Sequence, residues 1–112
     1  MTGAVPVQIA IEGRLLRFSR TAVAELPEGA SALAVADQAL RFNGQLRQAR
    51  LALAGSRLVV ESRLHDGQLK PAWMARASHA VACGWQYVRP PLCILTEQED
   101  VAASYAAMFG CE

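Results

Sequence analysis

The chain has 112 residues, 53% of them hydrophobic and 19% charged, and 11 basic against 10 acidic residues leave a formal net charge of +1. This length suits a single domain over residues 1–112, which buries roughly 65% of its unfolded surface without needing a metal or a disulfide. The balanced charge offers no basic face for nucleic acid, no apolar run reaches the about 18 residues of a membrane span, and no signal peptide is recognisable. We therefore expect a soluble cytoplasmic protein.

Alternating apolar residues predict a hairpin at the start of the chain. Residues 5–11 and 16–18 alternate apolar with smaller or polar side chains on either side of a turn at Glu12-Gly13. A two-residue loop at this turn would place Ile9 opposite Leu16, with the apolar residues on one face.

A third strand and a helix are expected next. Residues 21–26 could form the strand before Pro27-Glu28-Gly29 breaks the pattern. Ser31 is a plausible helix N-cap, and Asn43-Gly44 is a natural left-handed stop. Between these ends, apolar residues recur at helical spacing at Leu33, Ala36 and Leu40.

A second hairpin has the strongest local signal. Arg50–Ala54 and Arg57–Leu64 flank Gly55-Ser56, a Gly-X pair that suits a type II′ turn because glycine tolerates a positive φ. The two-residue loop fixes the register and puts apolar pairs on one face and an ion pair, expected to be screened by solvent, on the other. The pairs are Leu53 with Leu58, Leu51 with Val60, and Arg50 with Glu61.

Two further helices complete the predicted α+β fold. A long helix begins with Pro71 and must end before Pro90-Pro91, because proline lacks the amide donor and clashes with the preceding turn. The last helix opens with Thr96 and Glu99 in capping-box spacing and stops at Gly110. The fold class is therefore α+β, with a mostly antiparallel sheet of about five strands packed against helices.

The residues that could carry chemistry are few. Cys83, Cys93 and Cys111 have no metal-ligand spacing, and their odd number indicates reduced thiols, with packing as small core residues the default role. His79 lies four residues before Cys83, but two ligands are too few for a closed zinc site. His65-Asp66 reads as a solvated loop. We expect a protein without catalytic, cofactor-binding or metal-binding residues.

The stretch from Ala36 to Leu92 resembles type III secretion chaperones of the Tir-chaperone class. In that family a leucine-patterned helix precedes a hairpin, whose second strand often reads LVLEARL, and a long helix follows. Here Leu58–Leu64 reads LVVESRL. The chain is most similar to the small chaperones that escort the gatekeeper protein of the secretion apparatus. It departs from the family in lacking a helix before the first strand and in its balanced charge.

The resemblance implies a homodimer, or a heterodimer with a second small chaperone, that binds the N-terminal segment of a secreted effector or gatekeeper protein without ATP. Pro6 indicates an edge strand, whose Val7 and Ile9 would stay partly uncovered without the leading helix. We expect a partner to bind there, with Trp73 at the start of the long helix as a further anchor. The expected dimer interface consists of Leu33, Ala36 and Leu40.

Two other functions remain open from the sequence. A non-chaperone interaction module, such as an adaptor or a toxin-neutralising protein, would share every argument from composition, and only the partner's identity would separate it. An enzyme using Cys83 with His79 would require fast, pH-dependent alkylation of Cys83.

Overall fold

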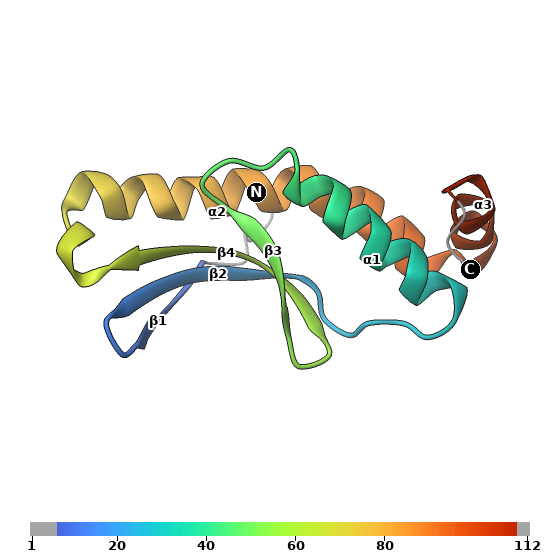
Figure 1. The fold of residues 1–112 in the computed structure, drawn as a ribbon, viewed down its shortest axis with the longest axis horizontal. Coiled ribbons are helices and arrows are strands. Elements are labelled where there is room, and N and C mark those ends of the chain that lie inside the picture. The colour runs from blue at the N-terminus through green and yellow to red at the C-terminus, as the bar shows by residue number, and fades with distance from the viewer. Residues whose placement is uncertain (1–6, 110–112) are drawn as a thin grey trace, which may run out of the picture.

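The computed structural model describes residues 7–109 and shows one antiparallel sheet packed against helices (Figure 1). The α+β class is confirmed. The four strands lie in the order β1-β2-β4-β3, and three helices and one 3-10 turn connect or cover them. In chain order the elements are β1 (Gln8–Glu12), β2 (Leu15–Val23), α1 (Ala30–Asn43), β3 (Arg50–Ala54), β4 (Arg57–His65), η1 (Asp66–Gln68), α2 (Pro71–Glu97) and α3 (Glu99–Phe109).

The predicted β3–β4 hairpin is confirmed residue by residue. Gly55 has a φ of +65°, Leu51 lies opposite Val60, and Arg50 lies opposite Glu61. The predicted solvent exposure of the ion pair is wrong, because the Glu61 side chain is only 1% exposed. Arginines from three strands surround it, and sequence alternation within one hairpin could not reveal Arg17, which comes from β2.

The N-terminal hairpin has a different register from the predicted one. Its loop is Gly13-Arg14, with Gly13 at a φ of +61°, and Ile9 lies opposite Phe18 rather than Leu16. The shift is two residues, so every side chain keeps its expected face. The position of β1 at the edge of the sheet is confirmed. Val5 and Pro6, on which that prediction also rested, lie outside the described residues.

The sheet has four strands and not about five. Residues 21–23 do not form a separate strand but continue β2, which pairs with β4 through an irregularity between Thr21 and Val23. A β-bulge lets one long strand bend while it continues the same ladder. The polar break at residues 27–29 instead leads directly into α1.

The long helix does not end before Pro90-Pro91, and α2 continues to Glu97. Leu92 and Leu95 are 0% and 5% exposed, and their burial offsets the amide donors that the prolines lack. Thr96 therefore lies inside α2, where its hydroxyl donates to the carbonyl of Leu92 at 2.8 Å instead of capping a new helix. Figure 1 shows the last part of α2 passing behind α1 towards α3. Gly110, the expected stop of the last helix, lies outside the described residues.

Both predicted caps of α1 differ in detail. Gly29 occupies the N-cap without a side-chain hydrogen bond, and Ser31 is buried inside the helix. The helix ends at Asn43 as expected, but Gly44 has right-handed angles. The Asn43 side chain binds both backbone groups of Leu51: its Nδ2 donates to the carbonyl at 3.1 Å, and its Oδ1 accepts from the amide at 2.7 Å.

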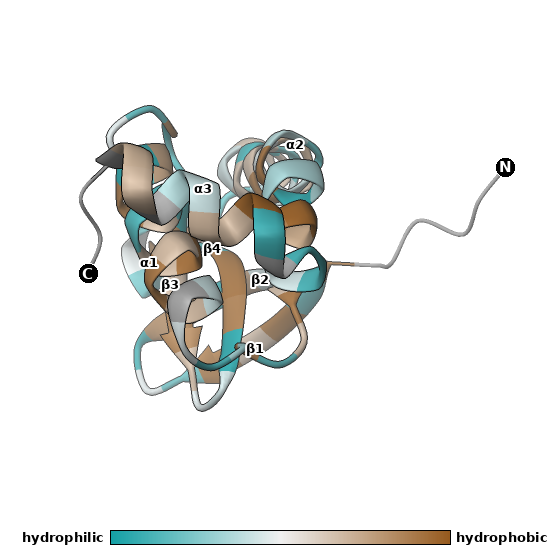
Figure 2. Ribbon diagram, turned by 90° about the vertical axis from the view of Figure 1, so that its right-hand side faces the viewer, coloured by the Kyte–Doolittle hydropathy of each residue, from teal (hydrophilic) through white to brown (hydrophobic). Residues whose placement is uncertain are grey.

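The core lies between the sheet and the helices, and Figure 2 shows hydrophobic stretches of β2 and β4 beneath them. Val60 and Gly84 lie at a close contact between β4 and α2, since a Cβ on Gly84 would lie 3.2 Å from Cγ1 of Val60. The fully buried side chains include Phe18, Val35, Val60, Val81, Val88 and Leu92. None of the helices within residues 7–109 has the length and apolar composition that crossing a bilayer would require.

Candidate functional site

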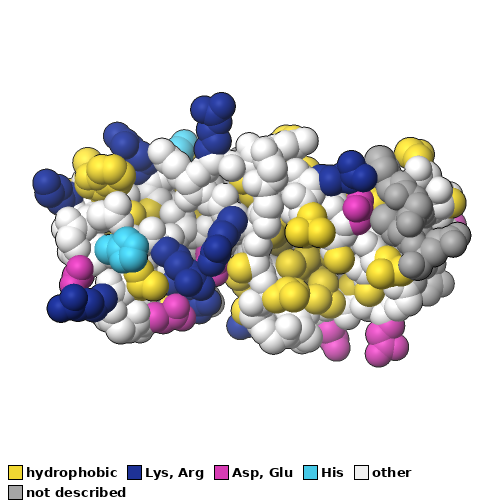
Figure 3. Space-filling model, viewed as in Figure 1, with side chains coloured by type: hydrophobic (Ala, Val, Ile, Leu, Met, Phe, Trp, Pro, Cys, Tyr) yellow, Lys and Arg dark blue, Asp and Glu magenta, His cyan; other side chains and the backbone are white. Residues whose placement is uncertain are grey.

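An apolar groove separates α1 from the β3–β4 hairpin. It has a volume of about 350 Å³, and the segment before α1 contributes Leu26 and Pro27 to its lining. Figure 3 shows hydrophobic side chains gathered on this part of the surface. The lining includes Leu26, Ala36, Ala39, Leu40, Leu53 and Leu58. We refer to this surface as the apolar groove.

The exposed leucines around the groove are unusual for side chains of their size. Leu40 is 72% exposed, Leu53 is 67% exposed and Leu33, on the same helix, is 45% exposed. The helix instead buries Ala34, Val35 and Phe42 on its other side. The structure therefore brings the predicted interface residues Ala36 and Leu40 into one groove and places Leu33 on the exposed part of α1.

Leu53 is the most exposed groove residue that sequence reasoning missed. Cross-strand pairing assigned it to the same face as Leu51 and Val60, which are buried. Leu53 lies next to the turn at the end of an edge strand, where the helices no longer cover the sheet. Its position beside Gly55-Ser56 was the available signal, because the tip of a hairpin commonly projects beyond the core.

The edge strand β1 presents a second apolar surface. Ile9 is 57% exposed and Ile11 is 81% exposed. Val7 is half-buried and packs against the core, so it is less available than the sequence suggested. Ile11, which the sequence analysis did not select, is the most exposed large apolar residue of this strand.

Trp73 lies in the first turn of α2 and is 42% exposed. The Arg76 guanidinium carbon lies 5.4 Å from the centroid of its ring, within cation–π range. Figure 1 places the start of α2 at the end of the sheet that lies away from α1. Trp73 and the apolar groove are thus separate surfaces.

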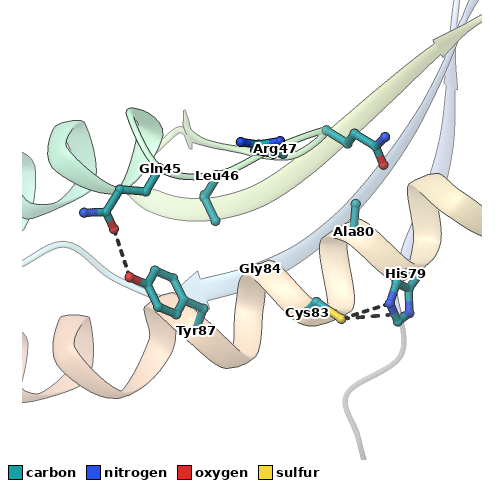
Figure 4. A pocket seen from close by; sticks show the side chains of 9 residues that line it. Gln45, Leu46, Arg47, His79, Ala80, Cys83, Gly84 and Tyr87 are labelled. Atoms are coloured by element: carbon teal, nitrogen blue, oxygen red, sulfur yellow. Dashed lines mark hydrogen bonds between the residues drawn. The ribbon is translucent and has the colours of Figure 1, made fainter.

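The predicted pair of His79 and Cys83 faces a hollow of about 620 Å³ between α2 and the loop before β3 (Figure 4). Cys83 Sγ lies 3.3 Å from Nε2 of His79, close enough to share a proton. Cys83 is exposed, so its expected role as core filler is wrong, whereas Cys93 is half-buried. Cys111 lies outside the described residues. Among the described residues no group of three or more His, Cys, Asp or Glu could hold a metal ion.

A polar network next to the groove joins α1 to α3. Tyr105 Oη donates to Asp37 Oδ2 at 2.7 Å, and Arg41 Nε donates to the same oxygen at 2.7 Å. These hydrogen bonds, that of Tyr105 first, lower the pKa of Asp37. Burial, together with the bond to Asp37, raises the pKa of Tyr105 to about 12.

The apolar groove and the outer residues of β1 are therefore two surfaces on which large apolar side chains are exposed. Large exposed apolar patches mark interaction sites in many proteins, and neither surface needs a reactive group to bind an extended chain. Comparison with protein-family models gave no match, and no curated protein sequence matches the chain at a significant level.

Proposed function

We propose that this protein is a type III secretion chaperone that binds the N-terminal segment of a secreted effector or gatekeeper protein and keeps it soluble and secretion-competent. The observation that carries the proposal is the apolar groove, where Leu40 and Leu53 remain 72% and 67% exposed. The order of α1, the β3–β4 hairpin and α2 supports it, as does the LVVESRL sequence of β4.

In this proposal the two apolar surfaces have different partners. The leucines of α1 pack against a second subunit, either another copy or a second small chaperone. The edge strand β1, with Ile9 and Ile11 exposed, contacts the extended cargo segment. Burial of apolar surface stabilises each contact by about 25 cal/mol per Å². Neither contact therefore requires free energy from ATP.

Co-expression with proteins encoded beside this gene tests the proposal. We expect a dimer or a stable complex by light scattering, with slower amide exchange in α1 and in residues 8–12 than in the isolated chain. A chain that stays monomeric at high concentration, with unchanged exchange beside every such partner, would contradict the proposal.

A non-chaperone adaptor or toxin-neutralising protein would use the same surfaces. The identity of the bound protein separates the two functions. A secretion apparatus would export the cargo of a chaperone but not the partner of an adaptor or a toxin-neutralising protein. Export of the partner should fall when this chain is deleted and recover when it is restored.

Thiol chemistry is a second candidate, favoured by the 3.3 Å separation of Cys83 Sγ and His79 Nε2. It requires Cys83 to react with iodoacetamide faster than Cys93, with a rate that depends on His79. An alkylation rate unchanged in His79→Gln would rule it out.

A further inference from the structure

The second half of β4 has a neighbouring strand on one side only. It pairs with β2 along its whole length, whereas its last pair with β3 is Glu61 with Arg50. Residues 62–65 therefore run past the end of β3. Hydrogen-bonding direction alternates along an antiparallel strand. Ala54 and Arg57 flank the two-residue loop as a hydrogen-bonded pair, so the backbone groups of residues 57, 59 and 61 point towards β3. By the same alternation, the amide and carbonyl of Arg63 point to the vacant side.

The loop before β3 does not continue the ladder along this edge. Gln48 has a φ of +63°, the only positive φ of a non-glycine residue in the described part of the chain. From there the chain crosses α2, where Leu46 and Ala49 lie 3.7 and 3.8 Å from the Cβ position of Gly84. Figure 1 shows this arc. Within residues 7–109 no backbone hydrogen bond joins the loop to residues 62–65. Gln48, in this uncommon backbone conformation, ends the ladder before β3 and lines the hollows on both sides of the edge next to Arg63.

Two hollows flank the open edge, one on each face of the sheet. The hollow on the α2 side has a volume of about 170 Å³ and is lined by Leu64, Trp73 and Arg76, among others. The other hollow, of about 470 Å³, contains Arg50 and Arg63. Since side chains of a strand alternate between faces, a strand laid along this edge would direct them into the two hollows in turn.

The larger hollow has an excess of positive charge. Glu61 is 1% exposed and is held by Arg50 at 3.0 Å, Arg63 at 2.9 Å and Arg17 at 3.9 Å. Glu12 balances Arg17 at 3.3 Å, which leaves one positive charge uncompensated among these five side chains. Arg50 and Arg63 are 58% and 40% exposed. Figure 3 shows Lys and Arg side chains gathered over this half of the face.

Glu61 has a specific effect on these two arginines. It binds Nε of both guanidinium groups and so fixes them where Arg50 and Arg63 line the hollow. A guanidinium fixed in this way loses less conformational freedom when it binds a carboxylate. The hollow on the α2 side, with the half-exposed ring of Trp73, suits an apolar side chain instead.

We propose that an extended segment of a partner protein, with alternating apolar and acidic side chains, adds to the sheet as a strand beside residues 62–65 of β4. Its backbone binds the amide and carbonyl of Arg63. An apolar side chain packs on Trp73, and a carboxylate binds Arg50 and Arg63. The inference rests on the proposed protein-binding function and specifies the chemistry of the bound segment, at a site separate from β1.

A titration of the full chain with an acetylated hexapeptide of alternating glutamate and leucine tests this inference. We expect the largest amide shifts in the NMR spectrum at Arg63 and its neighbours. The same peptide with every second backbone amide N-methylated cannot complete the ladder and should bind about tenfold more weakly. A peptide with lysine in place of glutamate should also lose about tenfold in affinity.

Matched variants locate the contact. Trp73→Ala should weaken binding of the glutamate–leucine peptide about tenfold. Ile94→Ala should not, although Ile94 is exposed to nearly the same extent on the same helix, at 44% against 42%. Arg63→Gln should abolish the preference for the glutamate over the lysine peptide. Equal binding of the N-methylated peptide, shifts centred on Ile9, or no shift at millimolar peptide would each overturn the inference.

The inference and the proposed function can fail separately. If a co-expressed secretion partner binds while amide exchange at residues 62–65 is unchanged, the edge is not its site and the proposed function stands. If the hexapeptide binds at this edge but no secretion partner binds the chain, the strand-addition site stands and the secretion role does not.

Discussion

Two nitrogens of the Arg50 guanidinium lie 3.0 and 3.1 Å from the same carboxylate oxygen of Glu61. Arg63 Nε reaches that oxygen at 2.9 Å. The Glu61 side chain is 1% exposed, so guanidinium groups have replaced water around a full negative charge. A buried charge of this kind is stabilised only while its partners remain in place.

Glu61→Gln should therefore lower the free energy of unfolding by about 2–3 kcal/mol, because it removes charged hydrogen bonds and leaves three arginines close together. Urea denaturation measures this loss. Glu25→Gln, at an exposed carboxylate, is the matched control and should change stability by less than about 0.5 kcal/mol. Equal losses in the two variants would show that the Glu61 cluster is not stabilising.

The contact between Val60 and Gly84 predicts a compensating pair of substitutions. Val60→Ala should cost about 2 kcal/mol by removing a fully buried side chain. In Gly84→Ala alone the methyl group would lie 3.2 Å from Cγ1 of Val60, so crowding there opposes the gain in helix propensity. In the double variant the added methyl group occupies the space that Val60 leaves. We expect a coupling energy of about 1 kcal/mol in a double-mutant cycle, and strict additivity would contradict this packing.

Leu40→Asp and Leu53→Asp should weaken self-association or partner binding by several kcal/mol, since each buries a charge at an apolar contact. Their melting temperatures should change little, because both side chains are largely exposed in the isolated chain. Analytical ultracentrifugation with and without the partner measures association. Ile94→Asp, at an exposed position away from the groove, should leave association unchanged. Equal weakening by all three variants would mean that general surface charge, and not the groove, controls association.

The Tyr105–Asp37 hydrogen bond predicts how stability depends on pH. The pKa of Asp37 is lower in the folded chain than its ordinary value of 3.8, so its contribution is present above that pH and is lost as pH falls through the folded pKa. The pKa of Tyr105 is raised from 10 to about 12, so its contribution is complete below pH 10 and is lost as pH rises towards 12.

Tyr105→Phe should therefore be less stable than the parent chain at pH 7, and the difference should disappear above about pH 12. Thermal melts across this range provide the measurement. Tyr87→Phe is the control, because Tyr87 Oη bonds the neutral side chain of Gln45. A difference that stayed constant up to pH 12 would mean that the tyrosine proton is not linked to folding.

The sequence predicted best the features that depend on neighbouring residues. Gly55-Ser56 set both the turn and the pairing of β3 with β4, since a two-residue loop leaves one register. At the first hairpin, Gly13 could occupy either loop position. A shift of two residues leaves every side chain on the same face of the sheet, so the apolar alternation fits both registers equally well. No other signal in the neighbouring residues distinguishes the two.

Features that depend on distant segments could not be predicted. Pro90-Pro91 are helix-ending residues locally, but burial of Leu92 and Leu95 against other elements maintains α2. The burial of Glu61 requires Arg17 from β2, which lies far away in the sequence. The apolar groove likewise exists only once α1 has packed beside the hairpin and left Leu53 uncovered.

Asn43 has a protective consequence for the outer edge of β3. An exposed strand edge with free amides and carbonyls is a template for ladders between molecules, and such ladders grow into fibrils. The Asn43 amide group occupies both backbone groups of Leu51, the second residue of β3. A second molecule cannot form an uninterrupted ladder there, so one asparagine at the end of a helix makes β3 a poor starting point for aggregation.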